Sequence, residues 1–201
     1  TSADDGWRHG EGGFRFDWTP NDADALSLQG DIFGGRDQTS AGAEHLSGGN
    51  AVVRWNRQLS SGGEIQAQAY YDRIERDDRA SGGGKFSTNT YDAEIQHNFT
   101  TGAHSVVWGG GARTVDYNIV GTSGLFFTPA HRNLFIANAF AQDSVALADN
   151  LTLVAGLKAE RLPYAGTSLL PEVRLAWKLA PAALIWASAE RAVRSPTPFD
   201  E

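Results

Sequence analysis

The five histidines carry the side chains in this sequence best suited to binding a metal or moving a proton. They are His9, His45, His97, His104 and His131. No two of them stand at the i, i+4 spacing that places paired imidazoles on one helix face, and the chain has no Cys to complete a thiolate site. The sequence therefore predicts no metal site, and it offers no residue as catalytic or as a cofactor ligand.

Two glycine runs, at 82–84 and 109–111, have the composition of a phosphate-binding loop but lack its setting between a strand and a helix. We interpret the first as a flexible loop and the second as a smooth strand face. Charged residues gather in segments 34–47 and 76–88, where they would meet a ligand, pair with lipopolysaccharide or simply be solvated. They are Arg36, Asp37, Glu44, Arg76, Asp77, Asp78 and Arg79.

The overall composition narrows the class of protein. The net charge of −7 argues against a nucleic-acid partner, which would favour a basic face. No stretch approaches 18 consecutive apolar residues, so no transmembrane helix is expected. The sequence shows no basic-then-apolar leader and contains no Met, and we interpret it as a processed product or an excised piece.

The elements that must position these residues are hairpins, and residues 133–161 show the pattern best. A strand leads to a turn at Ala148–Asn150, and in the next strand Leu151, Leu153 and Leu157 alternate with polar positions. This period of two is typical of a strand with different surroundings on its two faces. Four further hairpins repeat it, which predicts ten strands of about 8–15 residues and no helix. The pattern does not determine which side chains face which way in the strand before Ala148 or in the last strand, from Leu184.

The connections between these strands alternate in length. Short turns are expected near residues 20, 61, 102, 149 and 181, and loops at 34–47, 76–88, 118–132 and, of intermediate length, 162–168. The ends, 1–10 and 194–201, are also expected to be loops. In an up-and-down barrel this places every short turn at one rim, the periplasmic one, and every long loop at the extracellular rim.

Strand length and tryptophan placement favour a membrane. Eleven residues at about 3.3 Å each, tilted by about 45°, span about 26 Å, close to the apolar band of an outer-membrane barrel. Five tryptophans stand within about five residues of a short turn, as an interfacial belt would require. They are Trp18, Trp55, Trp108, Trp177 and Trp186. Arg57 and Arg73 fall on the apolar register but near strand ends, where they can snorkel to the interface.

The predicted fold is all-β: an antiparallel up-and-down meander of about ten long strands, part of an open or incomplete transmembrane β-barrel.

Several phrases in the chain resemble the barrel of TonB-dependent outer-membrane receptors. They are GGFRFDW (12–18), VVRWNRQLSSGGEIQAQAYYDR (52–73), YDAEIQHNF (91–99), AFAQDSVALADNLTLVAGLKAE (139–160) and RAVRSP (191–196). The resemblance implies a 22-stranded barrel with a plug domain inside, in the outer membrane of a Gram-negative bacterium. It implies active uptake of a scarce nutrient, such as a ferric siderophore or cobalamin, with energy supplied by TonB, and no enzyme activity.

The sequence departs from that family pattern in lacking a plug domain, a TonB box and a terminal aromatic strand. We interpret residues 1–201 as one partial transmembrane barrel domain, an internal segment that does not transport by itself. Its expected partners are outer-membrane lipid, a ferric siderophore or similar small ligand of the full receptor, and TonB through the missing plug. Two alternatives stay open. A self-contained ten-stranded barrel with protease-like activity would need its first and last strands to pair, and a soluble β-sheet binding module would need no detergent.

Overall fold

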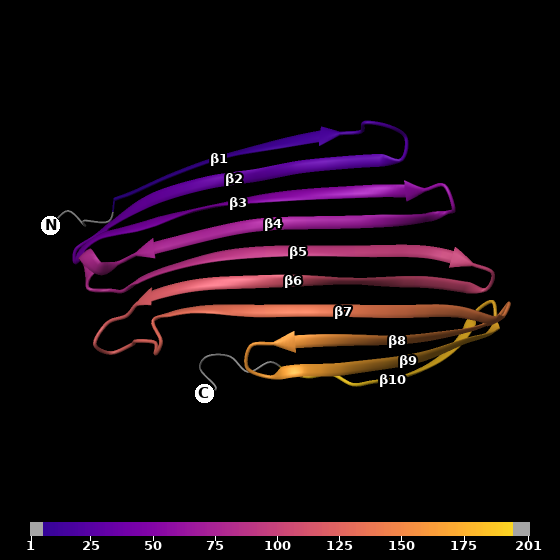
Figure 1. Ribbon diagram of the computed structural model, residues 1–201. Helices are drawn as coiled ribbons and strands as arrows, with labels where there is room; N and C mark the ends of the chain where they lie inside the picture. The colour runs from indigo at the N-terminus through magenta and orange to yellow at the C-terminus, as the bar shows by residue number, and fades with distance from the viewer. Residues whose placement is uncertain (1–5, 195–201) are drawn as a thin grey trace.

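The computed structural model describes residues 6–194, which form a single antiparallel sheet of ten strands in sequence order (Figure 1). Each strand is hydrogen-bonded to the next along the chain, so the predicted meander is confirmed. The strands are β1 (Trp7–Trp18), β2 (Asp24–Thr39), β3 (Gly42–Leu59), β4 (Gly63–Asp77), β5 (Lys85–Thr101), β6 (His104–Val120), β7 (His131–Ala148), β8 (Leu151–Leu162), β9 (Gly166–Ala180) and β10 (Ala183–Glu190). One short 3₁₀ turn, η1 (Arg79–Ser81), follows β4. No helix within the described residues is long and apolar enough to cross a membrane.

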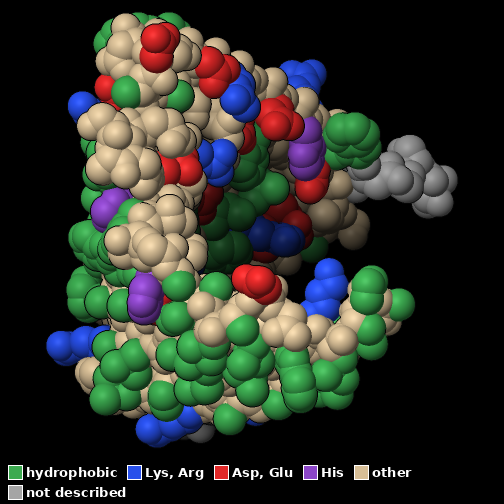
Figure 2. Space-filling view, turned by 90° about the vertical axis from the view of Figure 1, so that its right-hand side faces the viewer, with side chains coloured by type: hydrophobic (Ala, Val, Ile, Leu, Met, Phe, Trp, Pro, Cys, Tyr) green, Lys and Arg blue, Asp and Glu red, His purple; other side chains and the backbone are tan. Residues whose placement is uncertain are grey.

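The sheet is curved, and its two faces differ in chemistry. Because Cα partners on adjacent strands share a face, the apolar register of each strand continues onto the next, for example from Val53 to Ala69 and Ala93. We call this the outer face, and we call the opposite one, which carries Arg54 and Gln68, the inner face. Figure 2 shows charged side chains around a hollow enclosed by the sheet and hydrophobic side chains over the outside.

The structure resolves the strands whose facing the sequence left open. In β7, Ala139, Ala141 and Asp143 lie on the outer face with the apolar register of β6 and β8. In β10, Ile185 lies opposite Trp177 on the outer face, whereas Trp186 lies opposite Ala176 on the inner face. The prediction that Trp186 belongs to the interfacial belt is therefore wrong, while Trp18, Trp55, Trp108 and Trp177 do share the outer face.

The expected loop at 34–47 is wrong. Strands β2 and β3 continue through it and stay paired up to Thr39 and Gly42, leaving a turn of two residues. Toward the turn both faces of this hairpin meet water, so nothing selects alternating side chains there. Backbone hydrogen bonds maintain the ladder without that pattern.

The other connections at this rim are shorter than expected as well. The connections occupy residues 78–84, 121–130 and 163–165, and the chain expected to be a loop at 1–10 is already β1 from Trp7 onward. Long and short connections therefore do not alternate strictly, although the longest two do lie at this rim. Residues 191–194 follow β10 without regular structure, and the rest of the expected C-terminal loop lies outside the described residues.

The strands are tilted relative to the tryptophan belt. The line of Cα partners that starts at Trp18 in β1 reaches Leu169 in β9, eight residues from Trp177 at the short-turn rim. Eight inter-strand steps of about 4.8 Å cover about 38 Å, and eight residues of about 3.3 Å cover about 26 Å, which gives a tilt of about 35°. Transmembrane barrels have strands tilted by roughly 35–45°, so the belt is level only if the strands cross a membrane obliquely.

Candidate functional site

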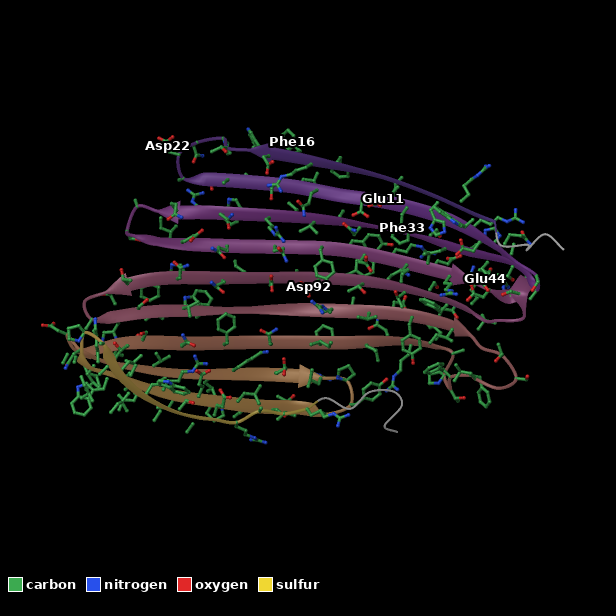
Figure 3. All side chains as sticks on the ribbon, turned by 180° about the vertical axis from the view of Figure 1, so that it is seen from behind. Glu11, Phe16, Asp22, Phe33, Glu44 and Asp92 are labelled. Carbon is green, nitrogen blue, oxygen red and sulfur yellow. The ribbon has the colours of Figure 1, made fainter. Side chains whose placement is uncertain are left out.

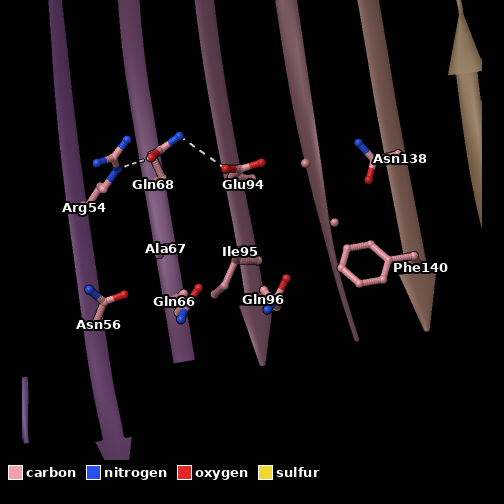
Figure 4. A pocket seen from close by; sticks show the side chains of 12 residues that line it. Arg54, Asn56, Gln66, Ala67, Gln68, Glu94, Ile95, Gln96, Asn138 and Phe140 are labelled. Carbon is pink, nitrogen blue, oxygen red and sulfur yellow. Dashed lines mark hydrogen bonds between the residues drawn. The ribbon is translucent and has the colours of Figure 1, made fainter. Parts of the chain in front are cut away.

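A ladder of polar side chains crosses the middle of the inner face. Arg54 of β3 donates from Nε to Oε1 of Gln68 on β4, and Gln68 donates from Nε2 to Oε1 of Glu94 on β5 at 3.2 Å (Figure 4). The three residues are successive Cα partners, so the strand register alone brings them together. The ladder places a cation, an amide and a carboxylate side by side on a face open to water.

A hollow of about 220 Å³ adjoins this ladder. Its floor is low because Gly111, the inner-face partner of Glu94 and Asn138, carries no side chain, and Asn138 and Phe140 of β7 border the hollow on the far side (Figure 4). Amide groups supply most of its polar lining, from Asn56, Gln66, Gln68, Gln96 and Asn138. Such a surface offers neutral donors and acceptors and suits a hydrated solute or another polar protein surface better than an apolar ligand.

A second polar group lies one step toward the long-loop rim. Arg113 donates from Nε to Oδ2 of Asp92 at 2.9 Å, and its guanidinium lies 5.5 Å from the centre of the Tyr70 ring. Asn50 donates to Oδ2 of Asp31 at 2.6 Å on the strands nearer β1. The inner face thus carries charges that are mostly paired, which keeps them in place without removing them from water.

The charged residues predicted at the loops separate onto the two faces. Asp37, Glu44, Arg76 and Asp78 lie on the inner side, where Arg76 pairs with Glu44 at 3.2 Å and with Asp78 at 2.6 Å. Figure 3 shows Glu44 at the long-loop end of the sheet, opposite the end that carries Asp22.

The other three charged residues, Arg36, Asp77 and Arg79, lie on the outer side. Asp77 stands at the tip of β4, beyond the apolar part of the strand. Its hydrogen bond from the Arg79 guanidinium, at 2.6 Å, lowers the pKa of Asp77 to about 2.

The histidines are distributed along the sheet, and three of them lie near a carboxylate. His9 meets Asp37 at 2.7 Å, His104 meets Asp143 at 2.6 Å, and His131 lies 3.5 Å from Asp116. Among the described residues no group of three His, Asp or Glu side chains is arranged to hold a metal ion. That no residue of this chain serves catalysis, a cofactor or a metal stays a prediction.

The outer face has its own polar contacts at the short-turn rim. The Trp55 indole donates from Nε1 to Oδ1 of Asp24 at 2.9 Å, and Arg57 lies 3.6 Å from the same carboxylate. Trp108 donates to Nδ1 of His97 at 3.1 Å. These indoles combine an apolar body with a satisfied N–H, as side chains at a membrane interface do. The position of Arg57 near a strand end is as the sequence predicts.

The family model described as "TonB dependent receptor-like, beta-barrel" matches residues 1–201. The chain belongs to the TonB-dependent receptor β-barrel family. No curated protein sequence matches it. Membership confirms the predicted fold class and places the chain in the outer membrane, in a family of transporters and not of enzymes.

Solved barrels of the family share the fold at low sequence identity. The copper transporter OprC has a TM-score of 0.73 at 14% identity, covering 97% of this chain and 38% of that one. The siderophore receptor PirA of Pseudomonas aeruginosa has a TM-score of 0.74 at 16% identity, covering 95% and 36%. A mutant ferric enterobactin receptor, PfeA, of the same species has a TM-score of 0.76 at 13% identity, covering 97% and 34%. The chain therefore spans little more than a third of each.

The alternative of a self-contained ten-stranded barrel finds no support in the sheet. Such a barrel needs β1 to pair with β10, and within the described residues each of these strands pairs on one side only. Both are fully exposed along their length.

The inner-face ladder is the feature that reading single strands could not find. Its members are ordinary polar residues, and only the register between three strands places them in contact. The available signal was the alternation of Gln66, Gln68, Glu94 and Gln96 with apolar neighbours, which indicated a polar face without indicating its pairs.

Proposed function

We propose that residues 1–201 form part of the barrel wall of an outer-membrane active transporter. The transporter takes up an iron–siderophore complex or a similar scarce nutrient, with energy passed to it by TonB. The observation that carries the proposal is the division of one tilted sheet into an apolar outer face and a polar, hydrogen-bonded inner face. Family membership and the likeness to siderophore and copper receptors support it.

In this arrangement the polar ladder lines the route through the barrel. Arg54, Gln68 and Glu94 present donors and acceptors to whatever occupies the lumen, either the plug of the complete receptor or a passing solute. The two unpaired sheet edges are where further strands of the barrel wall attach, because open edges leave backbone groups unsatisfied at a cost of several kcal/mol each in lipid.

The test is uptake by cells that produce the intact receptor carrying these residues. Accumulation of a labelled ferric catecholate, a ferric hydroxamate and copper would be compared with and without a protonophore. We expect one of these solutes to accumulate, only while the proton gradient is present, and Glu94→Ala to reduce that accumulation. Arg57→Gln, a charge change on the outer face, serves as the control. Accumulation that persists in full after the gradient is collapsed would refute active transport.

A further inference from the structure

Two arginines oppose each other on the outer face of β1 and β2 near the long-loop rim. Arg8 and Arg36 are direct Cα partners, and both side chains are exposed. Like charges directly across a strand pair destabilise a sheet. Within residues 6–194 neither arginine meets a carboxylate, and the contact that Arg36 makes is with Oε1 of Gln38, at 3.3 Å. Because neither cation is neutralised, an anion bound between the two arginines would reduce their repulsion.

The basic row extends to the next strand. His45 of β3 is the Cα partner of Arg36 and is exposed on the same face. The nearest acid on that face is Asp77 of β4, the Cα partner of His45, and it is already bound to Arg79 at 2.6 Å and close to Lys85 at 3.8 Å. The row therefore keeps a local positive charge on a chain whose net charge is −7.

The row stands at a defined height above the tryptophan belt. Arg8 lies ten residues from Trp18, and Arg36 lies ten residues from Leu26, which pairs with Trp18. Ten residues at about 3.3 Å, tilted by about 35°, rise about 27 Å. The apolar band of an outer-membrane barrel is ~25 Å tall, so the arginines stand where hydrocarbon gives way to lipid headgroups.

The surface directly below the arginines is smooth and apolar. Gly10 and Gly34 are partners in the row beneath, and the position of a Cβ at Gly10 has no atom within 4 Å. Below them Ile32 is 73% exposed and Phe14 is 56% exposed. A molecule held at the arginines by its phosphate could lay its acyl chains on this surface without meeting a side chain that stands in the way.

We propose that Arg8, Arg36 and His45 form a binding site for the phosphorylated headgroup of a lipid in the outer leaflet. Guanidinium groups bind phosphate through paired N–H donors, and the apolar strip below favours a lipid over a free anion. The inference rests on the proposed position of the outer face in the bilayer.

The test uses the intact receptor in dodecyl maltoside micelles, titrated with bis-phosphorylated lipid A, with its dephosphorylated form and with inorganic phosphate. We expect the phosphorylated lipid to bind most tightly. The double substitution Arg8→Gln/Arg36→Gln should weaken it by about twenty-five-fold, at about five-fold for each cation lost near a charged surface. The salt dependence of binding should become shallower in the same variant.

Two matched variants separate charge at this site from charge in general. Arg57→Gln removes a cation from the same face at the opposite rim and should leave the affinity unchanged. Arg36→Lys keeps the charge but loses the paired N–H donors, and it should weaken binding less than Arg36→Gln does. Equal binding of lipid A by the double variant and the unaltered receptor would overturn the proposal. So would equal affinity for the phosphorylated and dephosphorylated lipids, or binding of inorganic phosphate as tight as that of the lipid.

A second measurement keeps this site distinct from the placement on which it rests. In bilayers of brominated phosphatidylcholine, the indoles of the outer face should be quenched if that face meets acyl chains. Quenching without any preference for phosphate contradicts the headgroup site alone. Absence of quenching contradicts the membrane placement as well, and with it the proposed function.

Discussion

At the residue scale, the positions of charged side chains follow from which solvent each face meets. At the tip of β4, three cations and two carboxylates form a connected chain from Arg73 to Arg79 through Glu75, Lys85 and Asp77. Three of the four links are 2.6–2.7 Å long and the fourth, from Lys85 to Asp77, is 3.8 Å. All of them stand beyond the aromatic pair Tyr71–Tyr91, whose ring centres lie 4.9 Å apart. The charges are tolerated because water and headgroups, not hydrocarbon, surround them.

The carboxylate of Asp77 provides a pH test of this series of ion pairs. Its pKa is lowered from 3.8 to about 2, chiefly by the hydrogen bond from Arg79. A carboxylate with a lowered pKa in the folded state stabilises that state above the unfolded pKa and ceases to do so as the pH falls through the folded one. The contribution of Asp77 should therefore disappear between pH 3.8 and about 2.

Carbon-13 NMR of the side-chain carboxyl would measure the titration of Asp77 directly in the detergent-solubilised receptor. We expect a midpoint near 2, moving up toward 3.8 in Arg79→Gln. Arg8→Gln, on the same face but without contact to Asp77, should not move it. A midpoint that is the same with and without the Arg79 guanidinium would show that this hydrogen bond is not the cause.

At the element scale, glycines and aromatic rings on neighbouring strands fit together. The Phe14 ring lies 3.1 Å from where a Cβ would stand on Gly30, the Phe33 ring lies 2.6 Å from that of Gly48, and the Phe140 ring lies 3.1 Å from that of Gly109. An aromatic side chain that covers a glycine on the next strand shields backbone that would otherwise be bare.

Substitution at Gly30 should show what this fit contributes. A Cβ there would stand 2.4 Å from the backbone oxygen of Asn50, so Gly30→Val must displace β3 or the Phe14 ring. We expect a loss of about 1–3 kcal/mol in the free energy of unfolding. Urea titration of the receptor in lipid vesicles would measure it.

Gly12→Val is the matched control for Gly30→Val. Gly12 lies on the same face of the neighbouring strand with no atom within 4 Å of its Cβ position. The control should change the free energy of unfolding by less than about 0.5 kcal/mol. Equal losses in the two variants would mean that the volume next to Asn50 is not what excludes a side chain.

The elements also show why the sequence revealed some features and not others. Strand count, order and face were predictable because lipid on one side and water on the other impose a period of two. The ends of β2 and β3 were not, because above the bilayer both faces meet water and the pattern stops while the ladder continues. The ladder of Arg54, Gln68 and Glu94 depends on register across three strands, which the pattern within one strand does not encode.

At the scale of the whole molecule, the assignment of faces makes a prediction about charge. Ala93 lies near the middle of β5 on the outer face, between Tyr91 and Ile95 in the apolar register. Ala93→Arg would place a guanidinium in hydrocarbon near the bilayer midplane, which costs roughly 2–4 kcal/mol. Reversible unfolding by urea in vesicles should show a loss of that size.

The comparison for Ala93→Arg is the same new charge on the opposite face. Gln96→Arg, three residues along β5 on the inner face, adds a guanidinium where it meets water and should cost far less. If the two substitutions destabilised the receptor equally, the two faces would not differ in the solvent they meet, and this result would contradict the membrane placement.

The continuation of β2 and β3 to a two-residue turn bears on how the mouth of the transporter closes. A hairpin that keeps its backbone hydrogen bonds up to Thr39 and Gly42 is rigid, and it cannot fold over an incoming solute without breaking them. The connection at 121–130 is the longest in the described chain, so if the proposed transporter closes on this part of the wall we expect this connection to move. A disulfide that fixes the 121–130 segment should trap a solute or exclude it. A similar disulfide across the β2–β3 hairpin should leave passage of the solute unaffected.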